Sequence, residues 1–274
     1  MPWSIIFVGA CALGFGLLAR VFPCNPGQKA FSRETGDDVL YYLLNVLFYT
    51  GLSWLLITRA VESMLPGHAA AVLASLRAGW GWLPTLPIVV QILIMLLVTD
   101  VIQYWLHRGF HSARLWPFHA IHHGARNVDW ATTFRVHPVN YLAYSTSVAI
   151  LTQLMGFSPM VFVILGPINF VHAALVHANL NWTFGPFRYV LASPVFHRWH
   201  HVDDPALRDL NFAPTFPFLD VLFGTFYMPK GQLPQTYGAE GVPADFVGQL
   251  LHPFGSLAAW YAKAVRPGLG SSGA

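Results

Sequence analysis

The sequence has few charged residues and very little cysteine. Only 10% of its 274 residues are Asp, Glu, Lys or Arg, well below the share in a typical soluble protein. Its cysteines, Cys11 and Cys24, form no C-x-x-C pair and no disulfide framework, which argues against a cysteine-rich metal site. No H-E-x-x-H motif is present, so a zinc hydrolase of that kind is excluded. A net charge of +3 without a basic run argues against nucleic-acid binding and favours anchoring to anionic membrane lipids.

Long apolar stretches dominate what remains, since hydrophobic residues make up 55% of the chain. We therefore expect an all-α, integral-membrane helical bundle of about four spans. The clearest span is residues 83–106, whose only charge is Asp100 and which would be about 36 Å long as a helix. Residues 39–57 are a second span.

Three further segments complete the expected organisation. Residues 3–19 are apolar but lack the basic start and the cleavage pattern of a signal peptide, so we expect a retained first helix. Residues 141–156 and 159–176, broken at Ser158-Pro159, predict a helical hairpin or two short spans. The Gly- and Ser-rich residues 266–274 predict a disordered tail. We expect one domain over residues 1–274.

Histidines gather in three places along this apolar chain. Two segments share the spacing H-x-x-H-H, and an H-x-x-x-H pair precedes them. Because positions i, i+3 and i+4 share one face of a helix, we expect each H-x-x-H-H segment to point its three rings in one direction. Imidazole suits Fe, Zn, Cu and Ni, so the three segments predict a site for two metal ions. The histidines concerned are His107, His111, His119, His122, His123, His197, His200 and His201.

Basic residues predict the orientation in the membrane. Most of them lie in the same segments as the histidines, which by the positive-inside rule places those segments in the cytoplasm. Both H-x-x-H-H segments then lie on one side only if an even number of spans separates His123 from His197, and the predicted hairpin supplies them. The basic residues are Arg108, Arg114, Arg126, Arg135, Arg188, Arg198, Arg208 and Lys230.

Asp100 is the leading candidate for a residue that supports a metal ligand. It lies seven residues, about two helical turns, before His107. A ligand histidine usually donates its other N–H to a carboxylate or carbonyl, and a carboxylate within a span costs roughly 2.5–3.5 kcal/mol on the insertion scale without such a role. The alternative is that Asp100 lies at the membrane interface.

The order and spacing of several short motifs resemble the fatty acid hydroxylase (sterol desaturase) superfamily of membrane-bound non-haem di-iron oxygenases, bacterial members in particular. The resemblance covers residues 100–229. The motifs are His107-Arg108-x-x-His111, His119-x-x-His122-His123, Arg135-x-His137-Pro138, His177-Ala178-Asn179, His197-Arg198-Trp199-His200-His201, Asn211-Phe212 and Asp220-x-Leu222-Phe223-Gly224-Thr225.

The resemblance implies roles for individual residues. The eight histidines above become ligands of two iron ions, and His177 becomes the ninth. His172 and His137 are possible ligands, and His137 could instead orient a ligand, line the substrate entrance or begin the hairpin. Asn140 stands where relatives often have an acidic residue. Asp100, Asn211 and Asp220 are the predicted catalytic residues, the last two because they lie within the family-like motifs.

The resemblance also implies the chemistry. We expect hydroxylation of a lipid C–H bond by O₂ with two electrons, in a bacterial inner membrane and with the metal site on the cytoplasmic side. Because the sequence contains no haem domain, flavin fingerprint or iron–sulfur cysteines, a ferredoxin, cytochrome or reductase must supply the electrons. Desaturation by the same site is the alternative within the family. A membrane metal carrier or sensor is the alternative from another class, although a transporter would place its ligands in broken helices near mid-membrane.

Overall fold

The computed structural model describes residues 2–265, and that part of the chain is helical. It contains no strand, only one isolated bridge between Val202 and Tyr237, so the predicted all-α class is confirmed. The predicted tail, residues 266–274, lies outside the described residues. In chain order the elements are α1 Pro2–Val21, α2 Arg33–Tyr42, the π-helix η1 Leu43–Tyr49, α3 Thr50–Met64, α4 Ala69–Ala78, η2 Leu83–Thr85, α5 Ile88–Phe110, α6 Trp116–His123, η3 Trp130–Phe134, α7 Pro138–Met155, α8 Pro159–His177, η4 Gly185–Tyr189, α9 Pro194–His200, α10 Phe218–Leu222 and α11 Phe246–Val265.

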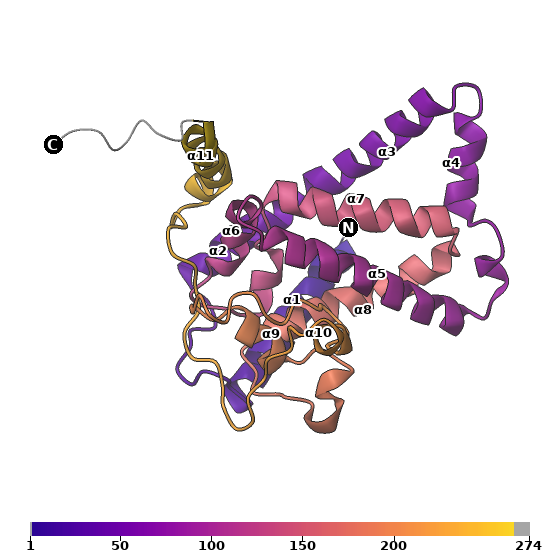
Figure 1. The fold of residues 1–274 in the computed structure, drawn as a ribbon. Coiled ribbons are helices and arrows are strands. Elements are labelled where there is room, and N and C mark those ends of the chain that lie inside the picture. The colour runs from indigo at the N-terminus through magenta and orange to yellow at the C-terminus, as the bar shows by residue number, and fades with distance from the viewer. Residues whose placement is uncertain (1, 266–274) are drawn as a thin grey trace.

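Four long helical columns give the molecule its shape. Helices α3, α5, α7 and α8 extend from the end that holds α6 and α9 to the opposite end, where α4 lies (Figure 1). Among residues 2–265, three helical stretches are long and apolar enough to cross a membrane: Arg33–Met64, Ile88–Phe110 and Pro159–His177. The membrane character is thus confirmed, whereas the number of spans stays a prediction, because α7 and α1 fall outside these three.

The span expected at residues 83–106 is displaced toward the C-terminus. Pro84 and Pro87 lack the backbone N–H that a helix interior needs, so the chain first forms the short η2 and α5 begins only after Pro87. It then continues to Phe110, which places His107 in its last turn. Residues 39–57 lie within the continuous helical stretch from Arg33 to Met64. The predicted break at Ser158-Pro159 is confirmed.

The tip of the hairpin is held at the end remote from the histidines. Gly156 ends α7 with φ of 75°, and a Cβ there would lie 2.2 Å from the carbonyl oxygen of Trp80. Only glycine therefore allows this approach. Trp80 donates its backbone N–H to the Gly156 carbonyl at 3.0 Å and its indole N–H to the Gln153 carbonyl at 2.9 Å. The hairpin is thus fastened to the segment that leads into α5.

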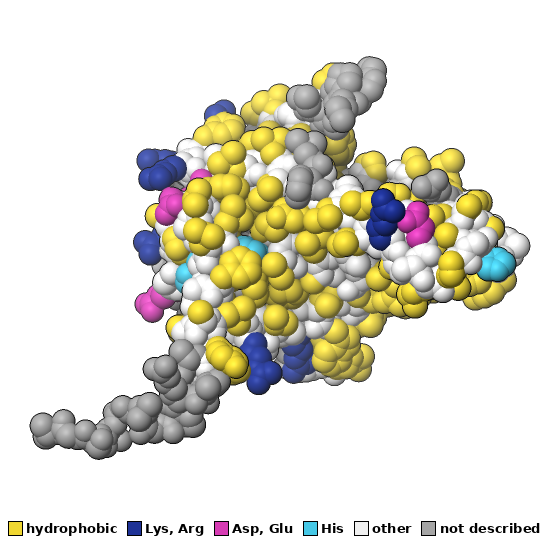
Figure 2. Space-filling model, turned by 90° about the horizontal axis from the view of Figure 1, so that it is seen from above, with side chains coloured by type: hydrophobic (Ala, Val, Ile, Leu, Met, Phe, Trp, Pro, Cys, Tyr) yellow, Lys and Arg dark blue, Asp and Glu magenta, His cyan; other side chains and the backbone are white. Residues whose placement is uncertain are grey.

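One face of the molecule is largely hydrophobic. Figure 2 shows a broad apolar face, with charged side chains gathered along its left edge, basic side chains at its lower edge and a smaller charged group toward the right. Large apolar side chains such as Leu93 and Val163 are exposed. Soluble monomers rarely expose continuous apolar areas beyond a few hundred Å², so this surface fits a lipid environment.

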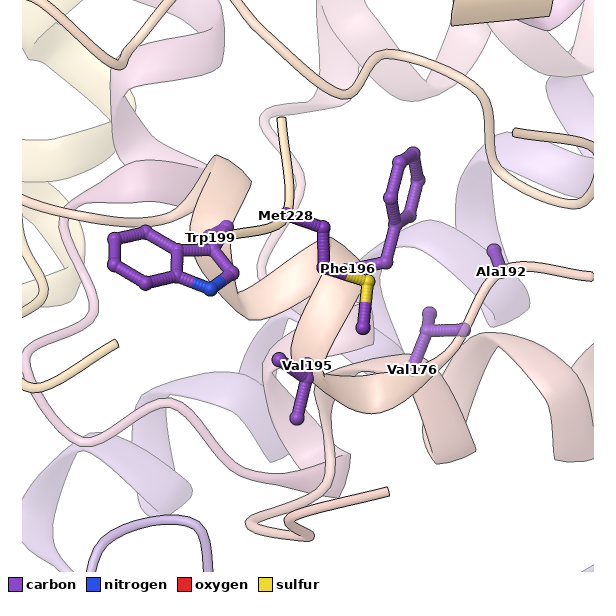
Figure 3. Packing of buried hydrophobic residues seen from close by; sticks show 6 residues of the cluster. All are labelled: Val176, Ala192, Val195, Phe196, Trp199 and Met228. Atoms are coloured by element: carbon purple, nitrogen blue, oxygen red, sulfur yellow. The ribbon is translucent and has the colours of Figure 1, made fainter. Parts of the chain in front are cut away.

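Helix α9 separates a hydrophobic core from the histidines. Val195, Phe196 and Trp199 pack with Val176, Ala192 and Met228 (Figure 3). His197 and His200 lie on the same short helix, at the positions that do not pack into this core. Ser193 caps α9 by accepting the backbone N–H of Phe196 at 3.2 Å. The core thus fixes the rotation of α9, and with it the direction of its histidines.

Candidate metal centre

Nine buried histidines meet at one end of the bundle, in two groups. Within each group one ring nitrogen from every residue lies within 4.8 Å of all the others. They come from the last turn of α5, from α6, from the end of α8 and from α9. The first group is His107, His111, His119, His123 and His200, and the second is His122, His177, His197 and His201.

The two H-x-x-H-H segments are divided between the groups. From the first segment, His119 and His123 belong to the first group, while His122 belongs to the second. In the second segment, His200 is the residue that crosses into the other group. The expectation that each segment points three rings in one direction is therefore wrong. The i, i+4 pair stays together and the remaining residue turns toward the neighbouring group.

Two backbone carbonyls, one on each side of Asn211, orient two histidines of the first group. His107 donates its Nδ1–H to the carbonyl of Phe212 at 2.8 Å, and His200 donates its Nδ1–H to the carbonyl of Leu210 at 2.7 Å. Asn211, between the two carbonyls, has φ of 58°, in the left-handed region. Asparagine tolerates this conformation better than most residues, and the turn it makes presents the flanking carbonyls to different rings.

Side chains orient two more rings of this group. His119 donates Nδ1–H to Oδ1 of Asn140 at 2.8 Å, and His111 donates Nδ1–H to Oδ1 of Asp209 at 3.1 Å. Asn140 thus does for His119 what a carboxylate would do, without adding a charge. Asp209, exposed at the surface, was not singled out from the sequence, because nothing in its spacing connects it with His111.

Backbone carbonyls serve the second group. His122 donates Nδ1–H to the carbonyl of Arg135 at 3.1 Å, and His177 donates Nδ1–H to the carbonyl of Ala173, one turn earlier in α8, at 2.7 Å. Such bonds fix the tautomer and the orientation of a ring that binds metal through its other nitrogen.

The Nε2 atoms of these rings then have lone pairs that face each other. A carbonyl can only accept a hydrogen bond, so a neutral ring that donates Nδ1–H carries no proton on Nε2. Yet the Nε2 atoms of His107 and His119 lie 2.9 Å apart, and those of His122 and His177 lie 3.2 Å apart. Facing lone pairs repel unless a cation lies between them. Buried ring nitrogens of His111, His123 and His200 also have no partner among the described residues. This donor set fits metal ions.

Burial keeps these rings neutral. It lowers the pKa of every histidine of the two groups that lies outside the membrane-spanning helices well below the ordinary value, and neighbouring histidines lower it further. A neutral imidazole is the form that binds metal. The residues are His111, His119, His122, His123, His197, His200 and His201.

Asp100 does not bond to a histidine, which corrects the expected support for His107. Its carboxylate accepts the backbone N–H groups of Thr215 and Phe216 at 2.8 and 2.9 Å. The reason is that the loop after Asn211 lies between Asp100 and His107, so a carbonyl from that loop takes the Nδ1–H that the carboxylate was expected to accept.

Asp220 and Asn211 also hold this loop and touch no histidine nitrogen. Asp220, fully buried, accepts the backbone N–H groups of Phe212 and Ala213 at 2.7 and 2.9 Å and the hydroxyl of Thr225 at 2.6 Å. Burial raises the pKa of Asp220. Asn211 donates its amide to the carbonyl of Phe196 at 2.9 Å and accepts the backbone N–H of Tyr227 at 2.7 Å. Both residues position the carbonyls that orient His107 and His200.

His137 and His172 lie outside both groups. His137 accepts the backbone N–H of Val139 at 3.2 Å and donates Nε2–H to the carbonyl of Leu250 at 3.1 Å, so of its three expected roles it begins the hairpin helix α7. His172 donates Nε2–H to the carbonyl of Ala192 at 3.2 Å and lines a cavity of about 240 Å³ beside His177.

Two arginines counted for the membrane orientation are buried. Arg135 bonds to Asp38 at 2.6 Å, which ties α2 to the loop whose carbonyl orients His122. Arg198 donates to the carbonyls of Val128 and His177. These cations support the histidine centre from inside and do not face lipid headgroups, so they add nothing to the positive-inside argument.

Comparison with known proteins gives the family. The family model for fatty acid hydroxylase matches residues 92–225. Ornithine lipid hydroxylase OlsE from Rhizobium tropici is 26% identical over 92% of this chain and 75% of its own length. Alkylglycerol monooxygenase from Danio rerio is 27% identical over 59% of this chain and 33% of its own length. Very-long-chain aldehyde decarbonylase GL1-11 from Oryza sativa is 28% identical over 50% of this chain and 53% of its own length.

No solved structure matches the chain. Residues 92–225 nevertheless form a fatty acid hydroxylase domain, and the family predicted from the histidine motifs is confirmed. The hydroxylase and monooxygenase relatives identify the chain as an oxidoreductase. The chain spans only about a third of the length of the alkylglycerol monooxygenases.

Proposed function

We propose that this protein is a membrane-bound non-haem di-iron oxygenase that hydroxylates a C–H bond of a lipid, using O₂ and two electrons from an external donor. One observation carries the proposal: a fatty acid hydroxylase domain holds two adjacent groups of neutral, buried imidazoles, one for each metal ion. The residues that would hold iron are His107, His111, His119, His123 and His200 at one position and His122, His177, His197 and His201 at the other.

Bound iron would supply the reduction of O₂ that attack on an unactivated C–H bond requires. The overall balance is R–H + O₂ + two electrons + two protons giving R–OH + H₂O. The chain's own residues keep the rings in place, because Nδ1–H bonds to carbonyls such as that of Phe212 make Nε2 the free nitrogen. Burial of the same rings keeps bulk water from the centre.

A lipid substrate fits the surroundings of the centre. The relatives that match over much of the chain are named for lipid substrates, and the surface around the long helices is apolar. The cavity that contains His177 and His197 lies between α5 and α8, both long enough to cross a membrane. A lipid can therefore reach the histidines from the bilayer.

The location and the electron donor are parts of the same proposal. Exposed arginines in the histidine-bearing segments favour a cytoplasmic centre in a bacterial inner membrane. A ferredoxin, cytochrome or reductase would provide electrons, since two cysteines cannot hold an iron–sulfur cluster within these residues. We treat residues 1–274 as one domain around the motif-bearing core of residues 100–229.

The test is lipid mass spectrometry combined with metal analysis. Cells that express the wild type, His200→Ala or the matched control His252→Ala, whose ring lies outside both groups, are grown with iron and O₂. We expect a lipid that gains one oxygen in the wild type and control but not in His200→Ala. A lipid that loses two hydrogens would instead establish a desaturase. Tight binding of zinc or copper, with no iron and no lipid change, would favour the carrier or sensor.

A further inference from the structure

A cavity of about 240 Å³ leads from the histidine centre into the membrane span. One wall is a face of α5 with the helical spacing 96, 99, 100, 103, and the opposite wall is a face of α8 with the spacing 169, 172, 173, 176, 177. His177 and His197 close one end. Both helices approach the centre with their C-terminal ends, since His107 and His177 lie in their last turns.

Two carboxamide side chains line this cavity at different depths. Gln103 lies one turn, about 6 Å, before His107 along α5. Asn169 lies two turns, about 12 Å, before His177 along α8. Gln103 is half-buried, whereas Asn169 is exposed and therefore lies where the cavity opens toward lipid.

These two side chains differ from the other polar groups of the cavity because nothing in the described structure pairs with them. Asp100 is used by the backbone of Thr215 and Phe216, and Thr99 donates its hydroxyl to the carbonyl of Met95 at 2.7 Å. A polar side chain within a membrane span is costly unless it has a partner or a function. The carboxamide groups of Gln103 and Asn169 are thus free to form hydrogen bonds with a ligand.

His172 adds an acceptor to the same cavity. Its Nε2–H is used by the carbonyl of Ala192, so in the neutral ring Nδ1 carries a lone pair. Together with two carboxamides, each with donor and acceptor atoms, the cavity offers partners for a group that both donates and accepts. A secondary amide has both functions, whereas a bare alkyl chain would leave all these atoms unpaired.

We propose that Gln103 and Asn169 bind an amide group of the lipid substrate, which presents to the histidines a carbon within about 6 to 12 Å of that amide. This inference rests on the proposed oxygenase function and adds to it the substrate class and the region of the lipid that reacts. The long apolar remainder of the lipid lies outside the cavity, along the exposed surface of α5 and α8.

Binding is tested first and without catalysis. Purified full-length protein in phosphatidylcholine nanodiscs is photolabelled with an N-palmitoyl amide that carries a diazirine, in competition with N-palmitoylethanolamine or with hexadecane. We expect labelling of α5 and α8 that the amide displaces and the hydrocarbon does not. Gln103→Leu and Asn169→Leu should each weaken binding about three- to tenfold, the value of one hydrogen bond. Ile168→Leu, on the neighbouring exposed position of α8, should leave binding unchanged.

Equal displacement by amide and hydrocarbon, or wild-type affinity in both leucine variants, would overturn the inference. Product analysis then separates it from the proposed function. With iron and a reductant, the wild type should place oxygen on carbons near the amide. The leucine variants should have a KM several-fold higher, with kcat changed less, and should place oxygen on a wider range of carbons. Amide-selective binding through Gln103 without oxygen incorporation into any lipid would support the inference and refute the oxygenase. If both leucine variants oxidise the lipid as the wild type does, the oxygenase function would be supported and the amide-binding inference refuted.

Discussion

Replacement of Asp220 by asparagine tests how the loop controls the histidine centre. The carboxylate receives three buried donors, two of them backbone N–H groups on different oxygens. Asparagine keeps one acceptor oxygen and turns its NH₂ toward the other N–H, which leaves a buried donor unpaired at about 1–3 kcal/mol and weakens the remaining bonds by about 1 kcal/mol. Since burial raises the pKa of Asp220, loss of the charge offsets part of this cost. We expect about 2 kcal/mol of destabilisation.

The metal should respond selectively to the same change. The carbonyls of Leu210 and Phe212 orient only His200 and His107, which belong to the first group. A shift of this loop should therefore lower metal affinity about 10–100-fold at one position, the usual effect of losing an orienting partner, while the other position keeps its metal. Anaerobic Fe²⁺ titration of the purified protein should then resolve one tight and one weakened ion.

The control is Asp203→Asn, which removes a charge from an exposed side chain of a neighbouring segment. Thermal unfolding and metal titration of this variant should match the wild type. If Asp220→Asn binds both ions as tightly as Asp203→Asn, the loop does not orient His107 and His200, and the reasoning from the carbonyls fails. Equal weakening of both ions would show that the loop supports the whole bundle and not one metal position.

Three further changes test the remaining parts. His200→Ala should lower bound iron toward one ion per chain, whereas His68→Ala, outside both groups, should bind as the wild type, as measured by elemental analysis. Burial raises the pKa of Asp129 to about 6, so between about pH 4 and pH 6 the folded state holds a proton that the unfolded state has released, and stability falls as the pH rises through this range. Asp129→Asn preserves the helix cap and should remove this pH dependence. Denaturant titrations at pH 7 should show it to be more stable than the wild type by about 1–3 kcal/mol. Reporter tags after Gly124 and after Lys230 should both report the cytoplasm, and opposite sides would refute the shared orientation.

The long helices were predictable because hydrophobicity and proline determine them locally. The break before Pro159 and the helices on either side of it follow from the missing N–H of proline and from two uninterrupted apolar stretches. The start of α5 was placed too early because the apolar composition continues through Pro84 and Pro87, where the helix cannot form. Hydropathy finds the apolar stretch, but proline decides where the helix begins.

The histidine pattern predicted a site for two metal ions but not how the rings divide. Helical spacing of about 100° per residue places i, i+3 and i+4 on one side of a helix, with i+3 about 60° to one side of i and i+4 about 40° to the other side. With two groups lying side by side, that angular spread is enough to send His122 to one group and His119 and His123 to the other. In the second segment His200 joins the first group, while His197 and His201 belong to the second. Which ring turns to which group depends on how α6 and α9 pack against each other, and the spacing within one segment does not predict that packing.

The orienting partners of the histidines were the part that sequence could reveal least, and the reason is chemical. Four of the six Nδ1–H groups with carbonyl or carboxylate partners bond to backbone carbonyls, those of Phe212, Leu210, Arg135 and Ala173. Every residue has a carbonyl, so no residue type marks these positions. What the sequence does mark are the side chains that hold such carbonyls in place. Asn211 and Asp220 belong to the family-like motifs, and both bond to the backbone that holds these carbonyls. Residues that touch no histidine nitrogen can therefore still decide whether the first group binds its metal.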